Sequence, residues 1–362
     1  MNRTPLHDLH VQLGAKMVDF AGWEMPLMYR GIIEEHQHTR NGCSVFDVSH
    51  MGRLKLTGAD AGALLQLVCT RNVADQSPGV SRYSHVCRED GGILDDVIVS
   101  RYENHWLMVC NASNRDKIVV WLEQHAAGKQ VDIVDQTSDT AMLAIQGPRT
   151  VELAERLLPL DLKSLKRYHF LTGSYIGMPY TIFRSGYTGE DGFEVIVPAG
   201  VARLIASELF AGGGPGGQGE VRPAGLGARD TLRMEAAMPL YGHELTESVD
   251  SLSAGQGWCV DLSKDFVGAD VLRRLTERGL PQKLVGLELA GRRIARQGAR
   301  VFAGDSAVGA VTSGTLSPTL GKSIAMAFVA AERASEGGSL DIEIAQARTP
   351  ALIVKLPFYK RK

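Results

Sequence analysis

The sequence predicts an α+β multidomain protein that ends in an all-β domain. Helical and strand patterns alternate irregularly, with frequent glycine turns, over residues 1–275. From residue 283 onward, short apolar runs alternate with turn signals such as Gly304-Asp305 and Ser317-Pro318. A chain of 362 residues is long enough for two or three domains. We therefore expect an N-terminal region of residues 1–275 and a C-terminal all-β domain of residues 276–362.

The elements of the N-terminal region follow from hydrophobic periodicity and turn signals. Helices are expected over residues 31–40, 59–67, 115–124 and from 224 onward. Strands are expected over residues 44–49, 53–57, 97–99, 106–111, 141–145 and 194–197. Gln146-Gly147-Pro148 interrupts the pattern, and Pro148 suits the first turn of a further helix. The glycine-rich segment 211–219 contains no lysine, so we expect a flexible loop and not a phosphate-binding loop.

Composition excludes several classes of function. The net charge of -2 gives no electrostatic support for coating nucleic acid. The five cysteines include no CxxC pair and the ten histidines form no metal-binding motif, so we expect reduced thiols, a cytoplasmic location and no metal. No stretch approaches the ~20 apolar residues of a membrane span, and no GxGxxG motif indicates flavin or nicotinamide binding. We therefore expect neither a nucleic-acid partner nor a membrane partner.

Two adjacent acids in an apolar strand are the most informative local feature. The segment reads Gly91-Gly92-Ile93-Leu94-Asp95-Asp96-Val97-Ile98-Val99. Side chains alternate along a strand, so Asp95 and Asp96 point to opposite sides and at least one carboxylate points into the protein. An ionised acid there is costly unless it is paired or used in chemistry. Taken alone, the segment favours a turn acid and a structural carboxylate.

Two later segments combine acidic, aromatic, basic and glycine residues. Residues 185–195 read SGYTGEDGFEV, a glycine-rich turn that enters a strand at Glu194. Residues 224–233 read AGLGARDTLR and begin a helix, on which Arg229 and Arg233 are four residues apart and share one face. Phe358-Tyr359-Lys360-Arg361 adds an aromatic and basic segment.

Further short motifs complete an ordered set that covers nearly the whole chain. They are TPLH (4–7), GAKMVDFAGW (14–23), DVSHMG (47–52), GGILDD (91–96), SGYTGEDGFE (185–194), GARDTLRMEA (227–236), FVG (266–268), VTSG (311–314) and SP (317–318). The set resembles the glycine-cleavage T-protein family of tetrahydrofolate-dependent aminomethyltransferases. The resemblance implies a folate-binding α/β region of two intertwined subdomains, followed by a C-terminal β-barrel or jelly-roll-like domain.

The resemblance also implies roles for individual residues. Asp96 would be the catalytic acid beside the reactive nitrogens of tetrahydrofolate, where it orients and activates N5. Glu194 would accept hydrogen bonds from the edge of the pterin, and Arg229 would contact the folate, whose glutamyl tail is anionic. Asp95 is expected to be structural, and Arg233 to support its helix through ion pairs.

A second tier of residues is expected to bind the folate. Met51, Tyr83, Asn111 and Tyr187 are candidates for lining the pocket, and a core or turn role fits each of them equally well. Arg361 corresponds to a basic position near the end of the family's chains. In the turn before Glu194, Glu190 and Asp191 are expected to be exposed.

The implied reaction starts from an aminomethyl group held on the lipoyl arm of the glycine-cleavage H protein. N5 of tetrahydrofolate attacks the methylene carbon and ammonia leaves. The products are 5,10-methylenetetrahydrofolate and the dihydrolipoyl H protein. We therefore expect tetrahydrofolate as the one-carbon acceptor, no metal, and the lipoylated H protein as a transient partner.

Two alternatives remain at the level of sequence. A folate-dependent demethylase of the same superfamily would share the fold and the folate site. A non-catalytic folate-binding factor for iron–sulfur assembly would carry a cysteine in a KGCYxGQE-like motif, whereas residues 185–190 read SGYTGE. One departure from the family is RRIAR at residues 292–296, where a Gly-Ile-Pro turn is more usual. It alters a loop of the β domain and leaves the folate residues unchanged.

Overall fold

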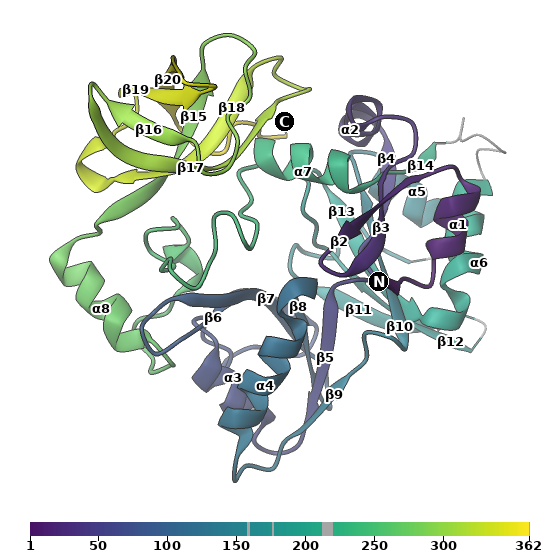
Figure 1. The fold of residues 1–362 in the computed structure, drawn as a ribbon. Helices are drawn as coiled ribbons and strands as arrows, with labels where there is room; N and C mark the ends of the chain where they lie inside the picture. The colour runs from purple at the N-terminus through teal and green to yellow at the C-terminus, as the bar shows by residue number, and fades with distance from the viewer. Residues whose placement is uncertain (158–159, 176, 212–219, 362) are drawn as a thin grey trace. The chain divides into compact units, whose positions relative to one another are not determined.

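The chain divides into two compact units whose segments alternate along the sequence. The computed structural model describes residues 1–157, 160–175, 177–211 and 220–361 (Figure 1). Unit 1 comprises Met1–Ala61, Gln76–Arg82 and Ile98–Leu232, and unit 2 comprises Gly62–Asp75, Tyr83–Val97 and Arg233–Lys362. Two strands, β6 (Val80–Cys87) and β7 (Ile93–Arg101), each contribute residues to both units.

The larger sheet of unit 1 has six strands in the order β11-β12-β13-β10-β4-β14. Their bounds are β4 Cys43–Asp47, β10 Thr140–Gln146, β11 Phe170–Tyr175, β12 Met178–Phe183, β13 Gly192–Pro198 and β14 Val221–Pro223. Strand β10 is antiparallel to both β4 and β13, and Ala144 pairs with Phe46 on one side and Glu194 on the other. Paired residues of neighbouring strands point to the same face. Glu194 therefore shares a face of the sheet with Phe46.

Helices cover both faces of this sheet. One face buries Val45 and Leu143 together with residues of α1 (His7–Gln12), α5 (Thr150–Leu157) and α6 (Ala199–Ala211). The opposite face buries Phe46 and Ala144 together with Ala228 and Leu232 of α7 (Leu226–Glu235). Because successive strand residues alternate between faces, the run Val45-Phe46 supplies both cores. The face that carries Glu194 is the one that α7 covers.

Smaller elements complete this part of the fold. A three-stranded sheet has the order β1-β3-β2, formed by β1 Asn2–Arg3, β2 Lys16–Phe20 and β3 Trp23–Met28, and α2 follows at Ile32–Asn41. A five-stranded sheet has the order β6-β7-β8-β5-β9, with β5 Gly52–Thr57, β8 Trp106–Cys110 and β9 Asp132–Asp135. The helices in these parts of the sequence are η1 Ala112–Asn114 and α4 Arg115–Ala126 of unit 1 and α3 Ala61–Val68, of which all but Ala61 belongs to unit 2.

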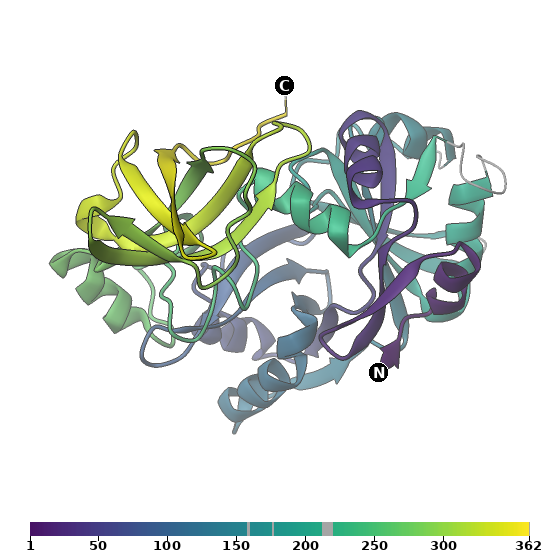
Figure 2. The ribbon, with the colours of Figure 1, turned by 45° about the horizontal axis from the view of Figure 1, so that its top comes forward.

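Unit 2 ends in a closed six-stranded barrel, seen in green and yellow in Figure 2. Its strand order is β15-β18-β17-β16-β19-β20. The bounds are β15 Gln282–Leu289, β16 Arg300–Ala303, β17 Ser306–Leu316, β18 Ser323–Ala330, β19 Ser339–Ile344 and β20 Ala347–Val354, with η2 Gly257–Cys259, α8 Ala269–Arg278 and η3 Ala331–Arg333 outside the barrel strands. Alternate residues such as Val285 and Leu287 fill the interior.

The structure confirms the α+β fold class and the C-terminal β-barrel. Pro148, expected in the first turn of a helix, instead precedes α5, because backbone bonds from Gly147 to Asp191 and from Arg149 to Gly42 hold this segment as a turn. In segment 292–296, which departs from the sequence pattern of the family, Ala295 is buried in the barrel core. The glycine-rich loop predicted at 211–219 lies outside the described residues, except for residue 211 at the end of α6. Across the described ranges, no helix is both long and apolar enough to span a membrane.

Candidate active site

Glu194 is a buried carboxylate held from one side by a hydroxyl group. It lies on β13, and only 8% of the residue is exposed. Ser185 donates its hydroxyl hydrogen to Glu194 Oε2 over 2.5 Å. Burial raises the pKa of Glu194, whereas the Ser185 hydrogen bond and the charge of Arg229 oppose this rise. Glu194 is thus a desolvated acceptor, of the kind that binds a donor edge of a ligand.

Arg229 projects from α7 toward an aromatic ring. Its guanidinium carbon lies 4.6 Å from the centre of the Tyr187 ring, a distance typical of a cation–π contact. Burial lowers the pKa of Arg229, although Tyr187 and Glu194 both favour its charged form. Its Nη1 atom is buried and has no hydrogen-bond partner among the described residues. A buried donor without a partner costs free energy, so this site suits an acceptor on a ligand.

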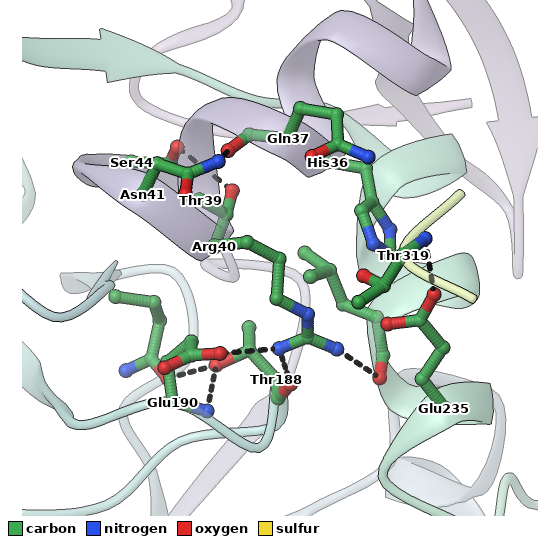
Figure 3. A network of polar contacts seen from close by, with 12 residues as sticks. His36, Gln37, Thr39, Arg40, Asn41, Ser44, Thr188, Glu190, Glu235 and Thr319 are labelled. Atoms are coloured by element: carbon green, nitrogen blue, oxygen red, sulfur yellow. Dashed lines mark hydrogen bonds and ion pairs between the residues drawn. The ribbon is translucent and has the colours of Figure 1, made fainter. Parts of the chain in front are cut away.

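Arg40 anchors the turn that carries Tyr187. Figure 3 shows Arg40 reaching from α2 to Thr188 and Glu190. Its Nη1 donates to the carbonyl oxygen of Thr188 over 2.7 Å and to Glu190 Oε1 over 2.8 Å. Its Nη2 donates to the carbonyl oxygen of Leu232 in α7 over 3.3 Å. One buried guanidinium therefore ties the turn of Tyr187 to the helix of Arg229.

The expectation that Glu190 and Asp191 are exposed is wrong. The Glu190 side chain is 3% exposed because it pairs with Arg40. Asp191 pairs with Arg184, with Nη2 and Oδ2 2.6 Å apart, and its side chain is 24% exposed. Glycine-rich acidic turns are usually solvated, and here arginines from outside the turn supply partners for both acids.

Gln146 fixes the other end of the same turn. Its Nε2 donates to the carbonyl oxygen of Ser185 over 3.0 Å, and its Oε1 accepts the Thr188 hydroxyl over 2.9 Å. A β-carbon at Gly186 would collide with the Gln146 amide group, so a larger residue there would force this amide, and the hydrogen bonds that it makes, to move. The backbone on both sides of Tyr187 is therefore held in place.

Asp96 and Tyr83 are brought together in unit 2. The Tyr83 hydroxyl donates to Asp96 Oδ2 over 3.1 Å. The Tyr83 ring stacks on Trp258, with centroids 5.3 Å apart and planes 20° apart. Asp95 is fully buried, whereas Asp96 is partly exposed. The alternation expected from the sequence thus leaves Asp96 as the accessible carboxylate of the pair.

The remaining predicted residues have less distinctive surroundings. Met51 is partly buried against the core that contains Phe46. Asn111 directly precedes η1, and Arg361 is exposed. Arg233 is fully buried and pairs with Glu244, with Nη1 and Oε2 2.9 Å apart, which agrees with a supporting role.

Sequence reasoning overlooked three residues that contact or adjoin the predicted ones. Ser185 contacts Glu194 directly and lies within a motif already noted. Trp258 stacks on Tyr83 although it is 53% exposed. His50 is 2% exposed, and its buried Nδ1 has no partner among the residues described. Burial and the nearby charge of Arg229 lower the pKa of His50 to about 3. The DVSHMG motif was the only signal for His50.

Among the described side chains, no metal-binding arrangement is found. In the part of the chain that the structure describes, no three His, Cys, Asp or Glu side chains form a group that could hold a metal ion. The chemistry available in unit 1 is instead a desolvated carboxylate, an aromatic ring and a buried guanidinium. In unit 2 it is a partly exposed carboxylate oriented by a phenol.

Comparison with known proteins identifies the family. The GCVT N-terminal domain matches residues 6–264, and the glycine cleavage T-protein C-terminal barrel domain matches residues 282–360. Aminomethyltransferases from Rubrobacter xylanophilus and Bacillus subtilis are 47% and 42% identical to the whole of this chain, over 95% and 100% of their own lengths.

A solved structure agrees with these sequence matches. The glycine cleavage system aminomethyltransferase T from Bartonella henselae matches with a TM-score of 0.92 at 34% identity. The match covers 99% of this chain and 98% of that one. The resemblance predicted from the ordered motifs is confirmed. The chain belongs to the glycine cleavage T-protein family of aminomethyltransferases.

Proposed function

We propose that this chain transfers the methylene of an aminomethyl group, carried on the lipoyl arm of the H protein, to tetrahydrofolate. Family membership over the full length supports the reaction class. The observation that carries the folate assignment is the group of Glu194, Tyr187 and Arg229, with a buried Arg229 Nη1 that lacks a partner among the described residues. Ammonia, 5,10-methylenetetrahydrofolate and dihydrolipoyl H protein are the products.

In unit 1, the proposed roles follow from the chemistry of each side chain. Glu194 accepts hydrogen bonds from the donor edge of the pterin ring, and the Ser185 hydroxyl holds its second oxygen. Arg229 binds an acceptor of the folate, while Tyr187 supplies aromatic contact area. Met51 and Asn111 are proposed to line the same pocket.

In unit 2, Asp96 is the proposed catalytic residue. Its carboxylate orients N5 of the folate and stabilises the positive charge that develops as the methylene is transferred. Tyr83 orients Asp96 through the hydrogen bond from its hydroxyl. Arg361 is proposed to meet the anionic tail of the folate.

Three further proposals concern the whole chain. All five cysteines are buried and outside any disulfide, which supports a reducing compartment and hence the cytoplasm. We also propose residues 1–275 as the folate-binding region and 276–362 as the barrel domain. The lipoylated H protein is the proposed transient partner.

The test is production of ammonia and methylenetetrahydrofolate from the aminomethylated lipoyl carrier, with and without tetrahydrofolate. We expect folate-dependent turnover that falls by orders of magnitude in Asp96→Asn, while folate affinity stays within a few-fold. Near-normal turnover in this variant would remove the catalytic role of Asp96. Folate binding without turnover on the carrier would favour the demethylase alternative, and absence of folate binding would refute the proposal.

A further inference from the structure

A buried histidine lies beside Tyr83 in unit 2. His85 follows Tyr83 by two residues on β6, so the two side chains point to the same side of the strand. His85 is 0% exposed, and its ring meets the Tyr83 ring edge to face, with centroids 5.6 Å apart. A fully buried imidazole is stable only when its polar atoms have partners.

Both ring nitrogens of His85 face hydroxyl groups. Nδ1 lies 2.7 Å from Ser251 Oγ, and Nε2 lies 3.4 Å from the Tyr83 hydroxyl oxygen. Tyr83 donates its own hydrogen to Asp96. The Tyr83 oxygen can therefore accept a hydrogen bond from His85, which places the imidazole proton on Nε2. His85 Nδ1 is then the acceptor of the Ser251 hydroxyl hydrogen.

The surroundings of His85 fix which atom donates in each of these hydrogen bonds. Burial lowers the pKa of His85 to about 3, so the ring is neutral near pH 7 and carries a single proton. Cys87 Sγ lies 3.9 Å from Ser251 Oγ, and burial raises the pKa of this thiol to about 12. The thiol thus keeps its hydrogen, which it can direct to the Ser251 oxygen.

We propose that Ser251, His85 and Tyr83 form a relay of oriented hydrogen bonds that fixes the Tyr83 hydroxyl on Asp96. His85 and Ser251 are then positioning residues for the transfer reaction, because they touch no reacting atom. The inference rests on the proposed function in one respect, the catalytic role of Asp96. Trp258 holds the Tyr83 ring by stacking, and His85 sets the direction of its hydroxyl, so the carboxylate is preorganised before substrate binds.

Two substitutions with amide side chains distinguish the roles of the two imidazole nitrogens. The amide nitrogen of His85→Gln can replace Nε2 as the donor to Tyr83. The shorter amide of His85→Asn can replace only Nδ1, which faces Ser251. We expect kcat to fall about 3- to 10-fold in His85→Asn, with KM for tetrahydrofolate within about twofold of wild type. His85→Gln should retain kcat within about twofold. Equal kcat values for the two variants, or wild-type kcat in His85→Asn, would overturn the relay.

A control variant and a double variant exclude a merely structural effect. Ser84 lies on the opposite face of β6 and is equally buried, with its hydroxyl 3.2 Å from that of Thr70. Ser84→Ala should lower stability and leave kcat unchanged. In a Tyr83→Phe background, His85→Asn should cause no further loss of kcat, because the acceptor has gone. Additive losses would contradict the relay.

Nitrogen-15 NMR of the histidine side chains tests the relay without any turnover. We expect one neutral tautomer of His85, protonated on Nε2, between about pH 6 and pH 8. A proton on Nδ1, or a charged ring, would overturn the relay even if the enzyme is active. The expected tautomer in a protein that lacks folate-dependent turnover would instead refute the proposed function and leave the hydrogen-bond network standing.

Discussion

Replacing Arg40 with methionine removes the charge that anchors the turn of Tyr187. Methionine is unbranched, apolar and somewhat shorter, so it fills most of the space without donating hydrogen bonds. The side chains of Arg40 and Glu190 are only 4% and 3% exposed. Arg40→Met therefore leaves the Glu190 carboxylate buried without this partner, and it deprives two backbone carbonyls, those of Thr188 and Leu232, of a donor.

The size of the effect follows from this burial. Removing one partner of a buried ion pair costs about 3–5 kcal/mol, because the other charge remains desolvated. Glu190→Gln leaves the Arg40 charge buried, but the Gln amide oxygen and the carbonyl oxygens of Thr188 and Leu232 can still accept its hydrogen bonds, so we expect a smaller loss of about 1–3 kcal/mol. The double variant Arg40→Met/Glu190→Gln buries no lone charge. It should therefore be more stable than Arg40→Met alone.

The stabilities of these three variants are compared by chemical denaturation, combined with hydrogen exchange of peptides covering residues 185–191. The control is Arg30→Met, which breaks a pair with Glu34 whose side chains are 40% and 51% exposed and should cost below about 0.5 kcal/mol. Stability of Arg40→Met within about 1 kcal/mol of wild type would refute the reasoning. So would a double variant whose loss equals the sum of the two single losses.

Three further substitutions test the electrostatics of unit 1. Burial raises the pKa of Glu194 above its ordinary value of 4.5, so ionisation of its carboxylate destabilises the folded state as pH rises above 4.5. Glu194→Gln should therefore raise the melting temperature at pH 7. A lower melting temperature in this variant would contradict the reasoning. Asp47 is buried, which raises its pKa, but hydrogen bonds from His10, Ser49 and Thr4 outweigh burial and lower the pKa to about 2. The free energy of unfolding of the wild type should thus fall by about 2 kcal/mol as pH falls from 3.8 toward 2. This fall should be absent when Asp47→Asn is unfolded over the same pH range. Arg229→Lys removes the planar group that lies over Tyr187 and should weaken folate binding about tenfold by calorimetry; unchanged affinity would argue against direct contact.

Local patterns predicted much of the fold because they report on one element at a time. Short apolar runs predicted the strand at residues 97–99, which lies within β7, and the all-β character of the C-terminal domain, and the helix that carries Arg229 begins at residue 226, close to its expected start. The accessible position of Asp96 follows from strand alternation next to the buried Asp95. Assignment of a ligand came from the resemblance of ordered motifs, since no single motif specifies a folate.

The sequence by itself determined the fold class, the family and the residue types available for chemistry. Only the tertiary structure decided which charged groups are buried and what pairs with them. Glu190 was misjudged because its partner, Arg40, is 150 residues away in the chain. His85 went unnoticed because its partner Ser251 is 166 residues away. The environment of an ionisable group depends on side chains that folding brings beside it, and periodicity along one strand or helix carries no information about those neighbours.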